Sequence, residues 1–283
     1  MRLSARQHFL LRLSAFGVLA FIYIPLLIIG IEAFNEARTL TWPPPAFTTE
    51  WFQRAFENTG ARDAFLYSLR TAAIATTIAL FLGSLAALGV SRFRFFGREA
   101  VSFLVILPIA LPGIVTGIAL NSTFTKVLGL DLGLLTLVIA HATFCIVVVY
   151  NNVIARLRRL STSFEEASAD LGATPWQTAR WVTLPNMRTA LVAGALLAFA
   201  LSFDEIIVTV FTIGVGEETL PQWLLNNFSR PQQLPIVNAV AVIVILLSII
   251  PVYLAHRLTR EEGSAAAPRG GGAVAAAEAT AAP

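Results

Sequence analysis

Residues 163–185 read SFEEASADLGATPWQTARWVTLP, and local chemistry alone predicts a shape for this stretch. Ser163 and Glu166 have the spacing of a capping box, so we expect a helix to begin there. Glu165 adds negative charge, which stabilises a helix N-terminus. Gly172 stands where a residue in the left-handed conformation would end the helix. The first half of the stretch therefore predicts one short helix that ends in a glycine elbow.

A second short helix is expected after the elbow. Thr174 and Gln177 form another capping box, with Pro175 at the first helical position. Pro185 is expected to break this helix just before the next apolar run. Three apolar residues of the first helix share one face, namely Phe164, Ala167 and Leu171. The stretch therefore predicts a small pair of helices with an apolar face.

Long apolar runs lie on both sides of this pair. The chain has 283 residues, of which 56% are hydrophobic and 13% charged, whereas a soluble domain has about 25% charged residues. Six runs approach the roughly 20 residues that cross a bilayer, and they lie near 13–33, 67–90, 100–121, 132–154, 189–213 and 236–256. Backbone in lipid must satisfy its own hydrogen bonds, and the runs do not alternate as barrel strands do. The chain is therefore predicted to be an all-α membrane protein with six transmembrane helices.

Basic residues predict the orientation of these spans. If both termini and the loop at 155–188 lie in the cytoplasm, the inner segments contain most of the 20 Lys and Arg. Cytoplasmic segments carry such an excess of Lys and Arg in membrane proteins. In this context the net charge of +3 indicates membrane topology rather than binding to nucleic acid.

The spans and their orientation divide the chain into three parts. We expect a cytoplasmic segment at 1–12, a membrane domain at 13–262, and a cytoplasmic tail at 263–283 whose Ala, Gly and Pro content predicts disorder. The first run has a basic start like that of a signal peptide, but it is longer and lacks an A-x-A-like site, so we expect a retained helix. The outer loop at 34–66 contains an amphipathic stretch that favours a short helix at the interface or under a partner.

Two spans contain residues that are unusual in lipid. Pro108, Pro112, Gly113 and Gly117 crowd the third span, which fits either a kinked helix at a gate or tight helix packing. Asp204 and Glu205 lie within the fifth, where charged residues usually face a water-filled path or a partner. We expect these acids to attract a cationic solute; the alternative is an ion pair or a capped helix break.

Polar residues around these acids extend the candidate path. Four of them form a stripe at helical spacing along the fifth span: Ser202, Glu205, Thr209 and Thr212. His141 lies within the fourth span, where hydrogen-bonded packing is the favoured interpretation over a proton relay. Cys145 is expected to be a buried, inert thiol.

The sequence contains no motif that would supply energy to a transport step. It lacks the G-x-x-x-x-G-K-[ST] loop that binds ATP phosphates, and it has no HExxH motif, no Cys/His cluster and no nucleophile elbow. We therefore expect no enzymatic activity and no cofactor bound by this chain. Energy for driven transport would have to arrive from another protein, and the helix pair at 163–185 is suited to receive it.

The stretch at 163–185 resembles the EAA loop of ABC importer permeases. That pattern is E-A-A, three residues, G, nine residues and I-x-L-P; here it reads Glu166-Ala167-Ser168, then Gly172, then Val182-Thr183-Leu184-Pro185. Ser168 and Val182 depart conservatively from the pattern. The resemblance implies a coupling helix near 164–175 that docks on an ATPase. The residues it assigns to coupling are Glu165, Glu166, Ala167, Ser168, Gly172, Ala173, Leu184 and Pro185.

The resemblance covers nearly the whole chain and is strongest to the second permease of spermidine/putrescine-type importers. Leu104–Leu120 and Leu201–Phe211 carry it outside the loop. It implies a type I importer fold in the bacterial inner membrane and a dimer of ATPase subunits that binds ATP and Mg²⁺. It also implies a second permease, more often homologous than identical, and an extracytoplasmic solute-binding protein. Lipid is the remaining expected contact, and no nucleic acid is expected.

Other functions remain open from the sequence. A secondary transporter driven by an ion gradient would use Asp204 or Glu205 as a coupling acid, but it would also predict paired broken helices in two halves, which the sequence does not indicate. A membrane scaffold would bind partners without moving solute. Related ABC importers carry opines, phosphonates or iron, so a polyamine substrate is the least constrained part of the prediction.

Overall fold

The computed structural model describes residues 4–39 and 41–265, and most of these residues lie in helices. In the described part of the chain the nearest approach to a sheet is one isolated bridge between Asn35 and Phe47. The helices are α1 (Ala5–Glu32), α2 (Glu50–Glu57), α3 (Thr59–Arg92), α4 (Arg98–Ala110), α5 (Gly113–Ser122), η1 (Thr123–Val127), α6 (Leu134–Leu157), α7 (Ser163–Asp170), α8 (Pro175–Thr178), η2 (Ala179–Thr183), α9 (Leu184–Phe203), α10 (Ile207–Thr212), α11 (Leu220–Phe228) and α12 (Leu234–Ala265).

The predicted spans correspond to these helices. Four stretches are long and apolar enough to cross a membrane, namely α1, α3, α6 and the continuous helix Pro175–Phe203. A fifth crossing is formed if the bent pair α4 and α5–η1 is one span, with 105° between its halves. The sixth predicted run lies in α12, whose apolar part among the described side chains is the shorter segment Leu234–Ile250. The all-α membrane fold is therefore confirmed, and the third span differs from the single helix expected.

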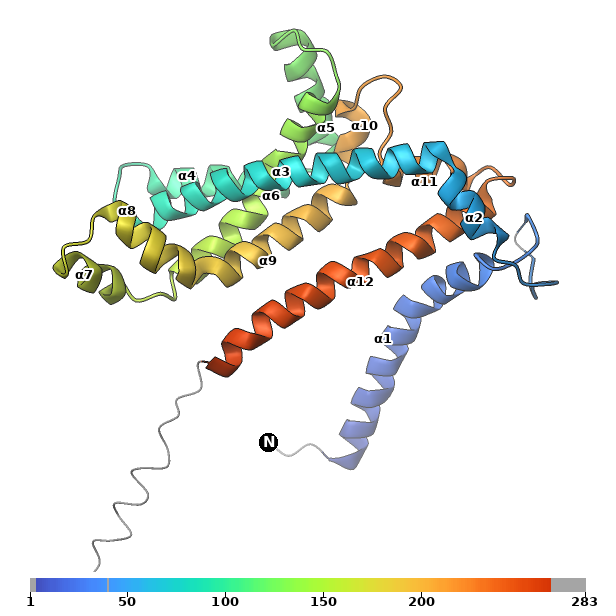
Figure 1. The fold of residues 1–283 in the computed structure, drawn as a ribbon, viewed down its shortest axis with the longest axis horizontal. Helices are drawn as coiled ribbons and strands as arrows, with labels where there is room; N and C mark the ends of the chain where they lie inside the picture. Colours follow the sequence, from blue (N-terminus) through green and yellow to red (C-terminus); the bar gives the residue numbers. More distant parts are fainter. Residues whose placement is uncertain (1–3, 40, 266–283) are drawn as a thin grey trace, which may run out of the picture.

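Three long helices, α3, α6 and α9, lie side by side and form the main core (Figure 1). α3 faces α6 with small residues at four-residue spacing: Ala75, Ala79, Gly83 and Ala87. A Cβ added to Gly83 would lie 2.9 Å from the carbonyl oxygen of Ile146 and 3.0 Å from Val149 Cβ. Because no hydrophobic effect drives helices together in lipid, such close contact is what stabilises the pair.

A second cluster lies at the opposite end of the molecule from α7 and α8 (Figure 1). There α2 packs on α12, and Trp51 is buried with its indole Nε1 donating to the Asn35 carbonyl at 2.8 Å. The amphipathic helix expected in the outer loop is thus confirmed. Trp51 and Ala55 on its apolar face are covered by helices of the same chain, whereas Phe56 is 68% exposed.

The last helix changes one predicted boundary. α12 continues to Ala265, so residues 263–265 are helical and are not part of a disordered tail. The prediction for residues 266–283 falls outside the described residues, as does that for residues 1–3. α1 begins at Ala5 behind a capping box of Ser4 and Gln7.

Candidate coupling loop and translocation site

The glycine elbow predicted at Gly172 is present. Gly172 has φ of 83°; its N–H donates to the Ala169 carbonyl at 2.9 Å, and the Ala173 N–H donates to the Ser168 carbonyl at 3.1 Å. This pair of bonds is a Schellman motif, in which a left-handed residue reverses the chain and satisfies the last carbonyls of a helix. Gly172 and Ala173 therefore set the angle between α7 and α8.

The second capping box is confirmed and the first is wrong. Thr174 and Gln177 exchange side-chain and backbone hydrogen bonds of 2.7 and 3.4 Å at the start of α8. α7 instead starts at Ser163 itself, so Ser163 lies inside the helix and cannot cap it. Its N–H donates to the hydroxyl of Ser161 at 3.2 Å, and Glu166 remains exposed.

The helix break predicted at Pro185 is not found. α8 passes through the π-helical turn η2 into α9, which begins at Leu184. The Leu184 N–H donates to the Ala179 carbonyl, five residues back. Pro185 falls in the first turn of α9, where its missing N–H costs little. The wider π turn lets the helix continue, so α8, η2 and α9 form one rod between the elbow and the membrane.

Glu165 joins α7 to two other elements. Its Oε1 atom accepts from Arg92 Nη2 at 2.9 Å and from the hydroxyl of Thr183 at 3.0 Å. Arg92 ends α3, and Thr183 ends η2. Glu165 was predicted to lie in the loop, but neither of its partners was predicted, because a contact across 73 residues leaves no local signal in the sequence. The ion pair braces α7 against the rest of the molecule.

The outward side of the loop is apolar and uncovered. Leu171 is 89% exposed, Trp176 71%, Trp181 70% and Phe164 60%. Ala167 and Glu166 are also exposed, whereas Ser168 turns inward, with its hydroxyl 3.0 Å from that of Thr178. Figure 1 shows α7 and α8 at the end of the long axis, beyond α9. The inner side of the loop is held by the hydrogen bonds of Glu165, and its outer side exposes apolar side chains to solvent. Such an exposed apolar surface is typical of a docking site.

Asp204 and Glu205 lie at a break in the fifth span, where the sequence analysis expected one helix at 189–213. α9 ends at Phe203 and α10 begins at Ile207. Glu205 Oε1 accepts from the Val208 N–H at 2.9 Å and so caps α10. Asp204 is exposed, and the described residues provide no hydrogen-bond partner for its carboxylate. The polar stripe therefore does not follow a single helix face, although Ser202 and Thr209 are both buried.

Comparison with known proteins identifies the family. Residues 79–261, which contain the loop and both parts of the fifth span, match the family described as "Binding-protein-dependent transport system inner membrane component". The match covers more than half of the chain. The chain belongs to this family. It is accordingly an inner-membrane permease of an ABC importer, which is a transport subunit rather than an enzyme.

Three similar permeases are named for the solutes that they transport. The spermidine/putrescine transport system permease protein PotC of Haemophilus influenzae is 36% identical over 90% of this chain and 98% of its own length. The putrescine transport system permease protein PotI of Escherichia coli K12 is 34% identical over 85% of this chain and 89% of its own. A putative 2-aminoethylphosphonate permease, PhnV of Salmonella paratyphi A, is 29% identical over 83% of this chain and 90% of its own.

Solved structures share the fold of this permease. A bacterial ABC transporter that imports alginate aligns with a TM-score of 0.67 at 18% identity, covering 92% of this chain and 99% of that chain. The MetNI methionine ABC transporter aligns with a TM-score of 0.56 at 21% identity, covering 71% and 94%. These likenesses confirm the type I importer architecture.

The permease has a second broken span, which packs on the first. α4 and α5 meet at Leu111 and Pro112, and α5 lies against α10. A Cβ on Gly117 would lie 2.5 Å from the Phe211 ring, and Asn121 Nδ2 donates to the Phe211 carbonyl at 2.6 Å. A kinked helix was one of the two interpretations of the Pro and Gly residues in the third span, and a capped helix break was the alternative given for the acids of the fifth. Pro112 explains the break in the third span, because it supplies no N–H to the ladder.

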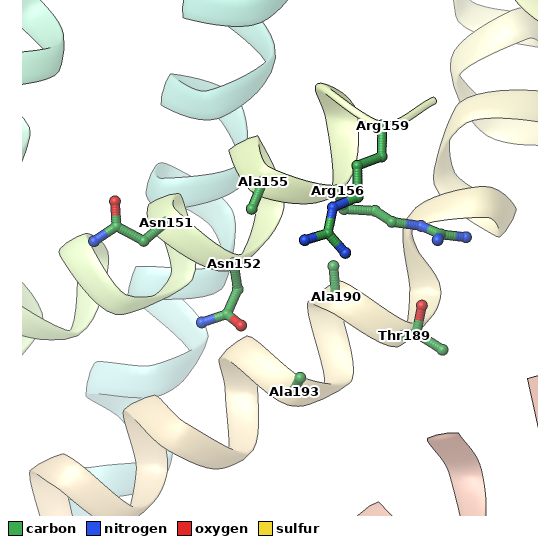
Figure 2. A pocket seen from close by; sticks show the side chains of 8 residues that line it. All are labelled: Asn151, Asn152, Ala155, Arg156, Arg159, Thr189, Ala190 and Ala193. Carbon is green, nitrogen blue, oxygen red and sulfur yellow. The ribbon is translucent and has the colours of Figure 1, made fainter. Parts of the chain in front are cut away.

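A groove between α6 and α9 opens near the coupling loop of the permease. Its volume is about 490 Å³, and Figure 2 shows its lining side chains: Asn151, Asn152, Ala155, Arg156, Arg159, Thr189, Ala190 and Ala193. Arg156 Nε donates to the Asn186 carbonyl at 3.0 Å and so ties the end of α6 to the first turn of α9. Two arginines and no acid in the lining make the groove electropositive.

Proposed function

We propose that this permease imports a polyamine of the spermidine or putrescine class. Relatives named for those solutes match it at 36% and 34% identity over most of its length, and this observation carries the proposal. A polyamine is a flexible polycation, and the exposed carboxylate of Asp204 beside the helix break suits a positively charged solute. The proposed path therefore runs past Asp204 and Glu205, with Ser202 and Thr209 behind them.

The energy for import comes, in this proposal, from an ATPase that docks on the coupling loop. The exposed side chains of Phe164, Leu171 and Trp176 fill a groove on the ATPase, and Glu166 lies beside them. ATP and Mg²⁺ bind to the ATPase subunits, and this chain binds no cofactor. Closing of the ATPase pair then moves α7, and the rod of α8, η2 and α9 carries that displacement to the break at Asp204.

The assembly that we propose contains a second permease, two ATPase subunits and an extracytoplasmic solute-binding protein. A homologous second permease is favoured over an identical one. Both termini and the loop at 155–188 face the cytoplasm, because this orientation places most Lys and Arg inside. ATP is bound more tightly in one state of the assembly than in the other. ATP binding therefore shifts the two permeases from the inward-open to the outward-open state.

Two other functions make different predictions. An aminophosphonate importer is suggested by the relative PhnV, whose solute carries both an amine and an anionic group. A gradient-driven transporter would use the acids at the break of the fifth span for ion coupling. Import that depends on ATP and not on a proton gradient excludes the second of these alternatives.

The test is uptake of radiolabelled spermidine, putrescine and 2-aminoethylphosphonate by cells that lack this gene, before and after the gene is restored. A Gly172→Asp variant at equal membrane level serves as the uncoupled control, because it places a negative charge on the exposed elbow beside the proposed docking face. Restored uptake of either amine by the wild type alone supports the proposal. Restored uptake of only the aminophosphonate overturns the polyamine assignment, and uptake in the variant equal to the wild type overturns the role of the loop.

A further inference from the structure

His141 is held on both sides by hydroxyl groups from the broken fifth span. The side chain is 1% exposed. Its Nδ1 atom lies 2.8 Å from the hydroxyl of Ser202, and its Nε2 atom lies 2.9 Å from that of Thr209. Ser202 belongs to α9 and Thr209 to α10. One imidazole ring from α6 therefore bonds to the helices on both sides of the break.

The direction of these bonds follows from the protons available. Thr209 donates its one hydroxyl proton to the Glu205 carbonyl at 2.7 Å, so it can only accept from His141. Nε2 of the neutral ring then carries the proton, and Nδ1 accepts from Ser202. A chain of bonds thus runs from Ser202 through His141 and Thr209 to the Glu205 carbonyl. Every polar atom in it has a partner, as buried groups require.

The break itself offers little else to fix α9 relative to α10 at this point. The last helical hydrogen bond of α9 is donated by the Asp204 N–H to the Ala200 carbonyl. The helical hydrogen bonds resume in α10, where the Val210 N–H donates to the Ile206 carbonyl. The far end of α10 is held separately, because Thr136 donates to the Thr212 carbonyl at 2.9 Å. The near end, next to Asp204, is bonded to Glu205 within the break, and the imidazole ties it to α6 and, through Ser202, to the end of α9.

We propose that His141 is a positioning residue for solute passage, which holds the end of α9 and the start of α10 together so that Asp204 between them keeps its place beside the path. This inference rests on the proposed transport function. It assigns no proton transfer to His141, because the chain of bonds ends on the backbone carbonyl of Glu205, which does not take up a proton. The residue acts through α9 and α10 and does not contact the solute.

The first test uses transport by the complete complex in membrane vesicles. His141→Leu removes both bonds and leaves two buried hydroxyls without their partner, so maximal uptake should fall about tenfold. The half-saturating solute concentration should change by less than about twofold, since α10 is not the capture site. His141→Asn can still reach Ser202 and His141→Gln can still reach Thr209, so each should retain more activity than the leucine variant. Thr76→Val, which removes a buried hydroxyl without a partner in α3, is the matched control and should be neutral.

A double-mutant cycle shows whether His141 acts through the two hydroxyls. In a Ser202→Ala, Thr209→Val background, His141→Leu should cost no more than about twofold further, because the bonds are already absent. A full tenfold additional loss would overturn the proposal. Equal activity of His141→Leu and the wild type at matched membrane levels would overturn it as well.

A thiol-labelling readout separates this inference from the identity of the solute. Val208, in α10, is 3% exposed, so Val208→Cys should label slowly with maleimide. We expect labelling to become about tenfold faster when His141→Leu is added, while the buried native Cys145 stays protected. If both thiols become reactive together, the variant has lost its packing generally and the positioning role is rejected. This result holds even if the wild type moves no polyamine, so failure of the substrate proposal is distinguishable.

Discussion

Arg92 Nη2 lies 2.9 Å from Glu165 Oε1 and so joins the end of α3 to α7, the proposed coupling helix. The Arg92 side chain is 20% exposed to solvent and the Glu165 side chain 25%. Glu165 also accepts from Thr183 in the π turn. Any displacement of α7 by a docked ATPase is therefore applied to α3 and to the rod of α9 at the same time.

Removing this ion pair should uncouple the loop. Arg92 Nε already lacks a hydrogen-bond partner in the described structure, so Glu165→Ala leaves a half-buried guanidinium without its anion. We expect Glu165→Ala and Arg92→Ala each to lower ATP-driven uptake about fivefold, with the double variant no worse than either. Solute moved per ATP hydrolysed is the measurement. Losses that multiply in the double variant would show that the two residues act independently.

Gly172 should tolerate asparagine better than alanine. Its φ of 83° is costly for a residue with a Cβ, but no atom lies within 4 Å of where that Cβ would stand. The cost of Gly172→Ala is thus conformational, about 1–2 kcal/mol, and Gly172→Asn should cost less because asparagine enters this region more readily. Uptake at equal membrane level should rank glycine, asparagine, alanine. An alanine variant as active as the wild type would contradict this ranking.

The outward face of the loop should be needed for ATPase capture and not for folding. Leu171→Ser changes a side chain that is 89% exposed, so thermal stability in detergent should stay within about 0.5 kcal/mol of the wild type. Recovery of the ATPase with the tagged permease should fall about tenfold, since burying a leucine contributes roughly 1.5–3 kcal/mol. Phe96→Ser, which alters another fully exposed apolar residue outside the loop, is the control. If both variants lower the recovery of the ATPase equally, α7 is not the specific docking site for the ATPase.

The two acids of the fifth span should behave differently. Glu205→Gln keeps an oxygen that can accept from the Val208 N–H, whereas Glu205→Ala removes the cap of α10 and should cost about 1 kcal/mol of stability. Asp204→Asn should leave stability unchanged and slow the uptake of a cationic solute. Unfolding temperature and initial uptake rate, measured on the same preparations, separate these effects. Wild-type uptake by the Asp204→Asn, Glu205→Gln double variant would exclude the acids from the path.

The contact of α3 with α6 should be sensitive to one methyl group. Gly83→Ala would place a Cβ 2.9 Å from the Ile146 carbonyl oxygen, and overpacking of this kind costs roughly 1–3 kcal/mol. Gly89→Ala, in the same helix with nothing within 4 Å, should instead be neutral or stabilising by up to about 1 kcal/mol. Thermal unfolding of the two variants compares them directly. If the two variants are equally stable, α3 and α6 can move apart slightly without a loss of folding stability.

Features that depend on neighbouring residues could be predicted from the sequence. The apolar runs predicted the membrane helices because lipid leaves a backbone no other way to satisfy its hydrogen bonds. Thr174 with Gln177, and Gly172 with its left-handed conformation, specify a cap and an elbow through contacts within a few residues. These local rules predicted the elbow and the second cap of the loop, but they assigned the first cap to the wrong residue and predicted a break at Pro185 that the helix does not have.

Features that depend on distant contacts were decided only by the tertiary structure. The break at Asp204 contains neither proline nor glycine; it lies where Ser202 and Thr209 meet His141, 61 and 68 residues away in the chain. The partners of Glu165 likewise come from the ends of other helices. Periodicity and capping describe a helix in isolation, whereas the energy of a buried hydroxyl or ion pair depends on which group packing brings within about 3 Å. For this permease, the sequence alone determined the apolar spans, the break at Pro112 and the elbow of the loop, whereas packing decided where the fifth span breaks and what braces α7.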